Sequence, residues 1–195
     1  RYVESLRKRV MERLGQGAGK VLQEMVDAGR LAGVIALGGN QGAAIGAMAL
    51  RDLPFGLPKM MVSTVTSNLQ HYLGAKDVLT LFSVADLLGG PNAITRRILD
   101  LAAGAMLGMV GLDRPMDLNQ AGQKVIAVTA LGNTHPAVTV AVEDLRQRGF
   151  EPVTFHASGA CGTAMEELIA EGKVAGVLDL TPHELTEEVL EDGIY

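Results

Sequence analysis

The chain has 195 residues, a formal net charge of −5, 48% hydrophobic residues and 20% charged residues. An apolar fraction of this size supports a folded core and excludes a disordered tail. The acidic balance and the 4% aromatic content argue against a nucleic-acid partner, which needs basic patches and stacking rings. The most apolar long stretch, residues 98–112, is too short to span a bilayer and contains Asp100, so we expect no membrane partner.

Cys161 is the single cysteine, which excludes an internal disulfide framework and a cysteine-rich zinc site. A lone thiol and a charged N-terminus without a secretory signal favour a cytoplasmic location. Because the first residue is Arg1 rather than Met, we expect the chain to be a fragment of a longer protein.

The first part of the chain reads, in order, as a helix over residues 2–28, a strand over 32–37, a helix over 43–51 and a strand over 59–63. A short helix or loop over 67–74, a strand over 78–84 and a long helix over 93–110 follow. After a linker at 112–123, the pattern predicts strands over 124–130, 152–156 and 174–180 and helices over 136–148, 163–171 and 182–190.

Strands that alternate with helices through short connections are typical of an α/β fold whose parallel sheets are flanked by helices. We therefore predict two Rossmann-like subdomains. The first covers residues 1–118, with its N-terminal part missing, and the second covers residues 119–195.

Glycines and small polar residues gather in the loops that follow four of the predicted strands. Ligands of parallel sheets bind outside the carboxyl ends of the strands, where glycines let backbone N–H groups approach a phosphate. These loops predict a site for a phosphorylated or anionic small ligand. Its candidate residues are Gly38, Gly39, Asn40, Gln41 and Gly42, then Ser63 and Thr64, then Gly132, Asn133 and Thr134, and finally Ser158, Gly159, Gly162 and Thr163.

Two familiar nucleotide motifs are missing from the sequence. No segment reads GxxxxGK[ST], so the chain is not a P-loop nucleotidase by motif. The first glycine loop reads Gly-Gly-Asn-Gln-Gly instead of G-x-G-x-x-G, which disfavours an NAD enzyme.

The remaining polar residues leave catalytic and metal-binding roles unassigned. His156 and Cys161 are either a nucleophile–base pair or a polar loop histidine and a small buried thiol. Asp179, at the end of the last predicted strand, either holds a metal or orients a hydroxyl, or it caps the next helix or holds its own loop. Arg96 belongs to a basic pair that either binds phosphate or lies on a solvated helix surface.

Several segments together resemble one family. They read Leu-Gly-Gly-Asn-Gln-Gly at 37–42, Pro-Lys-Met-Met-Val-Ser-Thr-Val at 58–65, Asn-Ala-Ile-Thr-Arg-Arg at 92–97, Phe-His-Ala-Ser-Gly at 155–159 with Ala-Met-Glu at 164–166, and Gly-Val-Leu-Asp-Leu-Thr at 176–181. In this order they resemble the tomato mosaic virus resistance protein-like ATP-binding family, whose bacterial members are of unknown function. Members of that family are about twice as long as this chain, in agreement with a fragment.

The resemblance implies two Rossmann-like subdomains that face a shared cleft, with ATP and Mg²⁺ bound there. The family's first loop usually reads Gly-Gly-Ser-x-Gly-Thr, so Asn40 and Ala43 replace two hydroxyls that could reach phosphate. If phosphoryl transfer occurs, Lys59, Arg96 and Asp179 are the candidates for stabilising charge or positioning a nucleophile.

Two other functions remain open. One is a non-catalytic interaction module in which a partner reads the ligand-bound state. The other is a hydrolase or lyase that acts on a small phosphorylated or anionic metabolite. Self-association through the long helices gives an expected homo-oligomer.

Overall fold

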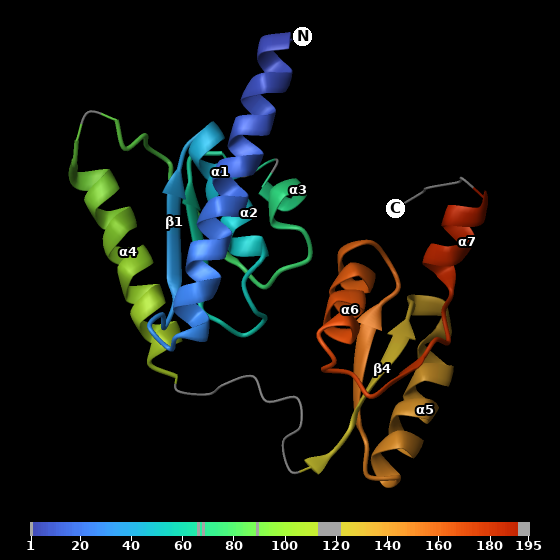
Figure 1. The fold of residues 1–195 in the computed structure, drawn as a ribbon. Coiled ribbons are helices and arrows are strands. Elements are labelled where there is room, and N and C mark those ends of the chain that lie inside the picture. The colour runs from blue at the N-terminus through green and yellow to red at the C-terminus, as the bar shows by residue number, and fades with distance from the viewer. Residues whose placement is uncertain (1, 66, 68, 89, 113–121, 191–195) are drawn as a thin grey trace. The chain divides into compact units, whose positions relative to one another are not determined.

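The computed structural model describes residues 2–65, 67, 69–88, 90–112 and 122–190. The chain forms two compact units, Arg1–Met116 and Asp117–Tyr195 (Figure 1). Each unit holds a three-stranded parallel sheet with helices packed around it, so the predicted α/β class with two Rossmann-like sheets is confirmed. The predicted boundary between residues 118 and 119 lies outside the described residues.

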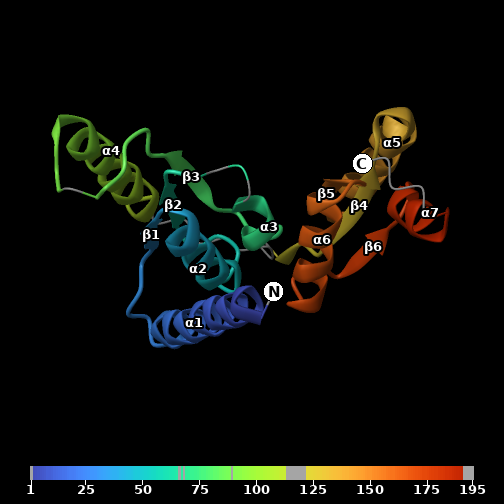
Figure 2. The same ribbon diagram turned by 90° about the horizontal axis from the view of Figure 1, so that it is seen from above.

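The first unit has the strand order β1-β2-β3, with β1 at Val34–Gly38, β2 at Lys59–Ser63 and β3 at Leu79–Phe82. Its helices are α1 (Tyr2–Asp27), α2 (Asn40–Arg51), α3 (Leu69–Leu73) and α4 (Ala93–Val110). Figure 2 shows α2 and α3 on one side of this sheet and α4 on the other. Since both crossovers step in the same direction, right-handed connections require α2 and α3 to share a face.

Strand β2 forms the centre of the first unit and is buried along its whole length. Met61 packs with Ala47 and Leu50 of α2, whereas Met60 and Val62 pack with Ile98 of α4. This alternation follows from the two-residue period of a strand. It also explains why a strand buried on both faces reads as a continuous apolar run.

The second unit has the strand order β5-β4-β6, with β4 at Val125–Ala130, β5 at Glu151–His156 and β6 at Gly176–Leu178. Its helices are the short 3₁₀ turn η2 (Gly132–Thr134), α5 (His135–Gln147), α6 (Ala160–Ala170) and α7 (His183–Leu190). The chain leaves β4 towards β5 and then crosses back to β6. Right-handed crossovers therefore put α5 and α6 on opposite faces of the sheet, as Figure 2 shows.

Most predicted elements are found within a few residues of their expected bounds. The strand at 59–63 and the helix at 93–110 match the predicted ranges. Helices α2 and α6 begin three residues earlier than predicted, at Asn40 and Ala160. Both therefore start within the glycine loops, which places backbone N–H groups of a helix's first turn at each loop.

Candidate functional site

The carboxyl ends of the three strands of the first unit meet at one edge of the sheet. Gly38 is paired with Ser63, and Ser63 with Phe82, so the loops that follow start side by side. The backbone N–H of Ser83 donates to the Ser63 carbonyl over 2.8 Å and extends this pairing by one residue. A small cavity of about 30 Å³ lies at this edge, lined by Gly38, Gly39, Val62, Ser63, Thr64, Ser83, Asp86 and Leu87.

The turn from β1 into α2 depends on Gly38. A Cβ at this position would lie 2.5 Å from the carbonyl carbon of Gly42 and 2.6 Å from the nitrogen of Ala43. Such distances do not occur between real atoms, so only glycine lets the strand enter the helix this tightly. The tight turn brings Gly39, the N-cap residue of α2, to the cavity.

The N-terminus of α2 lacks a side-chain cap. Gly39 is the N-cap residue, has no side chain to accept a hydrogen bond, and no acidic residue stands in the first turn. Helix α4 is the contrasting case, because the Asn92 side chain accepts from the N–H groups of Ile94 and Thr95. An uncapped N-terminus carries unsatisfied N–H donors and a partial positive charge, which together favour an anion.

Of the two hydroxyls predicted beside this loop, Thr64 is the one placed towards the helix start. Its Oγ1 would lie 3.5 Å from a Cβ at Gly39. Ser63 is buried, and its hydroxyl donates to the Val65 carbonyl over 2.8 Å while it accepts from the Val65 N–H over 3.0 Å. The Ser63 hydroxyl thus stabilises the turn at residues 63–65. The other predicted residues of this loop, Asn40, Gln41 and Gly42, lie exposed in the first turn of α2.

Two polar residues of the cavity lining, Ser83 and Asp86, were missed by the sequence reasoning. Ser83 directly follows β3 and its hydroxyl donates to the Ala85 carbonyl over 2.7 Å, in the same arrangement as Ser63. Asp86 is exposed at the cavity and one of its carboxylate oxygens accepts from the Leu88 N–H over 2.9 Å. Their position in the sequence could have indicated them, because both residues follow a strand of the same parallel sheet.

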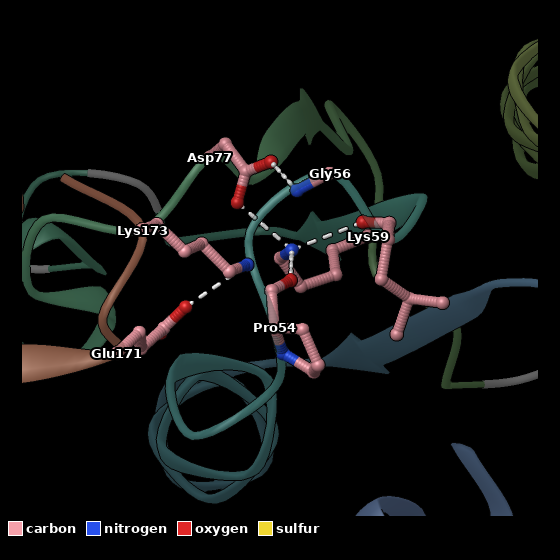
Figure 3. A network of polar contacts seen from close by, with 7 residues as sticks. Pro54, Gly56, Lys59, Asp77, Glu171 and Lys173 are labelled. Carbon is pink, nitrogen blue, oxygen red and sulfur yellow. Dashed lines mark hydrogen bonds and ion pairs between the residues drawn. The ribbon is translucent and has the colours of Figure 1, made fainter. Parts of the chain in front are cut away.

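Lys59 lies at the opposite end of β2 from the cavity. Ser63 is four positions further along the strand, which corresponds to about 13 Å. Its side chain is fully buried, donates to the carbonyls of Pro54 (2.6 Å) and Leu57 (3.0 Å), and pairs with Asp77 at 2.8 Å (Figure 3). Lys59 therefore holds the loop at 54–58 and cannot stabilise charge at the carboxyl edge.

The other basic candidate, Arg96, is exposed in the first turn of α4. Its guanidinium donates to the Pro91 carbonyl over 3.3 Å. This contact holds the loop before α4.

In the second unit, the carboxyl ends of β4 and β6 carry a closed cluster of polar groups. The Thr129 hydroxyl donates to Asp179 over 2.6 Å, and the N–H of Thr181 donates to the Thr129 hydroxyl over 3.0 Å and to Asp179 over 3.2 Å. The hydroxyls of Thr134 and Thr181 lie 2.7 Å apart. Asp179 thus fixes the loop after β6, while Gly132 and Asn133 are exposed in η2.

The loop between β5 and α6 brings His156 next to Ser158, not to Cys161. The Nδ1 of His156 lies 2.6 Å from the Ser158 hydroxyl, and Cys161 is exposed. The Thr163 hydroxyl donates to the Gly159 carbonyl over 3.2 Å within the first turn of α6. The predicted buried thiol is therefore wrong, because Cys161 is exposed, and the contact that His156 makes in this loop is with Ser158.

Glu184 of α7 occupies the start of α6. Its carboxylate lies where a side chain at Gly162 would be, and it accepts a hydrogen bond from the Gly159 backbone. Burial and the nearby charge of Glu166 raise the pKa of Glu184, and the Gly159 hydrogen bond opposes them. Among the candidate residues of the second unit, Gly159 and Gly162 are thus already in contact with a carboxylate of the same chain.

Neither a metal cluster nor a membrane span is found in the part of the chain that the structure describes. In that part, no three His, Cys, Asp or Glu residues come together as a ligand set. No helix there is both long enough and apolar enough to cross a bilayer.

Similarity to known proteins covers both units. Family models described as the N-terminal and C-terminal domains of the uncharacterised protein family UPF0261 match residues 2–115 and 123–194. A UPF0261 protein of Clostridium tetani is 39% identical over 182 residues, which are 92% of this chain and 44% of that protein. The UPF0261 protein RA0729 of Rhizobium meliloti is 39% identical over 160 residues, 82% of this chain and 39% of that protein.

A plant protein is similar to the same degree. The ToMV resistance protein Tm-1(GCR237) of Solanum lycopersicum is 38% identical over 168 residues, 84% of this chain and 22% of that protein. The chain thus spans less than half the length of these relatives. The predicted resemblance is confirmed, and the chain belongs to the UPF0261 family.

Proposed function

We propose that the protein binds ATP as its magnesium complex, with the phosphates on the turn from β1 into α2. The observation that carries the proposal is the uncapped N-terminus of α2, which opens at a cavity beside the Thr64 side chain. Backbone N–H groups from the first turn, at Asn40, Gln41 and Gly42, would donate to phosphate oxygens. The amide side chains of Asn40 and Gln41 add donors where the family's usual hydroxyl is missing.

The residues at the cavity also fit a magnesium ion. Mg²⁺ prefers hard oxygen ligands and is commonly held by one or two carboxylates together with substrate phosphates. Asp86 supplies a carboxylate and Thr64 a hydroxyl at the same cavity. When bound, the ion would offset the charge of the phosphates, and Asp86 would orient it.

A cytoplasmic location belongs to the same proposal. Mg-ATP is available in that compartment, and the exposed thiol of Cys161 would stay reduced there.

Calorimetric titration with ATP, with and without Mg²⁺, tests the proposal in wild type and in Gly39→Asp. At Gly39 the backbone angles are φ −84° and ψ −157°, which any residue adopts, and the nearest atom to a new Cβ is 3.5 Å away. Aspartate is a favoured N-cap, so Gly39→Asp should fold while its carboxylate takes the phosphate position. We expect saturable binding in wild type and its loss in this variant.

Two matched variants separate charge from shape. Gly39→Asn supplies the same cap without charge and should retain more binding than Gly39→Asp. Gly104→Asp adds the same charge on α4, where a Cβ meets no atom within 4 Å, and should bind as wild type does. Absence of ATP binding in wild type, or equal binding in Gly39→Asp, would overturn the proposal.

A second candidate function rests on the 2.6 Å contact between His156 and Ser158. An imidazole nitrogen beside a serine hydroxyl can take its proton and make it nucleophilic, which suits a hydrolase acting on an anionic metabolite. Labelling by a fluorophosphonate, lost in Ser158→Ala and reduced in His156→Gln, would support this function. If Ser158 stays unlabelled, the contact is structural.

A further inference from the structure

Helix α1 has two apolar faces, and the described residues of its unit cover one of them. On the covered face, Gly15 and Gly19 approach α2, with Met48 and Ala49 as their neighbours, and Leu22 and Val26 pack against the core. The other face carries Leu6, Val10, Leu14, Gly17 and Val21, and we call these five residues the α1 stripe. Their spacings of four, four, three and four residues place them along one side of the helix.

The side chains of the α1 stripe are exposed to an unusual extent for aliphatic residues. Leu6, Val10, Leu14 and Val21 are 46%, 49%, 54% and 56% exposed. A helix that is apolar on opposite faces is typically buried on both. A continuous stripe of this kind marks an interaction surface, whereas single exposed apolar residues would need no explanation.

The stripe is complementary to a second copy of itself in the antiparallel direction. Gly17 leaves a flat place on the helix, because no atom lies within 4 Å of where its Cβ would be. If two copies cross antiparallel with the two-fold axis between positions 14 and 17, Leu14 of each copy lies on Gly17 of the other. Val10 of each copy then faces Val21 of the other. At the centre of the interface Leu14 fills the space left by Gly17, and the two valine pairs lie on either side of that centre.

Charge favours the same direction of pairing. Between Leu6 and Leu14 the helix carries four basic residues, Arg7, Lys8, Arg9 and Arg13, and one acidic residue, Glu12. Between Gly15 and Asp27 it carries two acidic residues, Glu24 and Asp27, and one basic residue, Lys20. Antiparallel helices bring the basic half of one copy to the acidic half of the other, whereas parallel helices would put the basic halves together.

We propose that the chain forms a two-fold symmetric homodimer through the α1 stripe, with the two α1 helices antiparallel. The interface is isologous, so a change at one stripe residue acts twice in each dimer. This inference is independent of the ATP proposal, because the stripe contains none of the residues at the α2 N-terminus.

Sedimentation velocity and light scattering on the 195-residue chain test the proposal. We expect a particle of twice the 20.5 kDa chain mass for wild type and a monomer for Leu14→Glu, since the variant places two carboxylates at the centre of the interface. Val140→Glu is the matched control, because Val140 on α5 is also exposed, at 70%, and lies in the other unit. The control should remain a dimer.

Crosslinking determines the direction. In a Cys161→Ser background, a short bismaleimide should join two copies through Leu14→Cys, which lies near the two-fold axis. Leu6→Cys, far from the axis, should stay unlinked when the helices are antiparallel and would be linked when they are parallel.

A monomeric wild type would overturn the dimer, as would a dimer that persists in Leu14→Glu. If Leu14→Glu lowers the unfolding midpoint of a wild type that is already monomeric, another part of the same chain covers the stripe. Crosslinking of two copies through Leu6→Cys would overturn the antiparallel arrangement.

Discussion

The ammonium group of Lys59 lies 2.8 Å from the Asp77 carboxylate, and the two residues join the start of β2 to the segment before β3. The Lys59 side chain is fully buried and the Asp77 side chain is 44% exposed. The other Asp77 oxygen accepts from the Gly56 N–H over 2.8 Å, so one carboxylate holds both the lysine and the loop that covers it (Figure 3). We therefore expect changes at Lys59 and Asp77 to alter the stability of the first unit.

Asp77→Asn should destabilise the first unit by about 3 kcal/mol, because it removes a carboxylate charge that lies 2.8 Å from a buried ammonium. Lys59→Met should lower the free energy of unfolding by less, since the variant has no buried charge that needs a partner. Urea unfolding followed by circular dichroism would measure both. Asp144→Asn is the matched control, because Asp144 on α5 and the C-cap residue Arg148 form an exposed pair that should contribute less than about 1 kcal/mol. Equal effects of Asp77→Asn and Asp144→Asn would contradict the role of burial.

The turn from β1 into α2 makes a second prediction. Gly38→Ala should destabilise the chain by about 1–3 kcal/mol or more, because its Cβ would overlap the backbone at Gly42 and Ala43. Gly39→Ala is its control and should be tolerated, since only the Thr64 hydroxyl comes within 4 Å of the new carbon. Thermal unfolding of the two alanine variants checks this difference. A stable Gly38→Ala would show that the turn can relax.

The sequence predicted the order of elements well because prolines, glycines and apolar runs act locally. Pro58 precedes β2 and Asn92 caps α4, and these two elements were bounded correctly. The sequence predicts later starts for α2 and α6 than the structure shows, because glycine-rich segments favour turns over helices. In the structure each helix begins directly after a glycine, α2 after Gly39 and α6 after Gly159.

The sequence predicts which of the candidate residues lie close together only in part. Gly38, Gly39, Ser63 and Thr64 do come together, since parallel strands end at one edge. Lys59 could have been excluded from the sequence alone, because it opens the same strand that Ser63 closes. The contact of Glu184 with Gly162 joins residues on different helices, and no local pattern indicates it.

Asp179 makes a prediction that distinguishes a structural carboxylate from a metal ligand. Asp179→Ala should destabilise the second unit by about 1–3 kcal/mol, because the buried Thr129 hydroxyl loses its acceptor. Asp179→Asn retains an oxygen acceptor and should be much milder. Unfolding midpoints measured with and without EDTA check both variants. A wild-type midpoint that falls in EDTA, with no such response in Asp179→Asn, would favour a metal role.

Glu184 makes the last prediction, which concerns pH. Burial, followed by the charge of Glu166, raises the pKa of Glu184 above its usual value when α7 lies on α6. The Gly159 hydrogen bond and the charge of His183 act in the other direction, and Glu187 adds to the increase. A raised pKa means that the contact is favoured when Glu184 is protonated. Its full contribution is therefore present below the pKa of the undocked side chain and is lost as the pH rises through the docked value.

Hydrogen exchange of the α7 amides measures the docking of this helix directly, after correction for the intrinsic effect of pH on exchange. We expect protection of residues 183–190 to decrease as the pH rises from about 4 towards neutrality. Glu184→Gln keeps the shape and the contact with Gly159 but cannot ionise, so its protection should be higher at neutral pH and should lose most of this dependence. Glu188→Gln is the matched control on an exposed position of the same helix and should behave as wild type. If Glu184→Gln and wild type showed the same protection at every pH, the ionisation of Glu184 would have no part in holding α7 against α6.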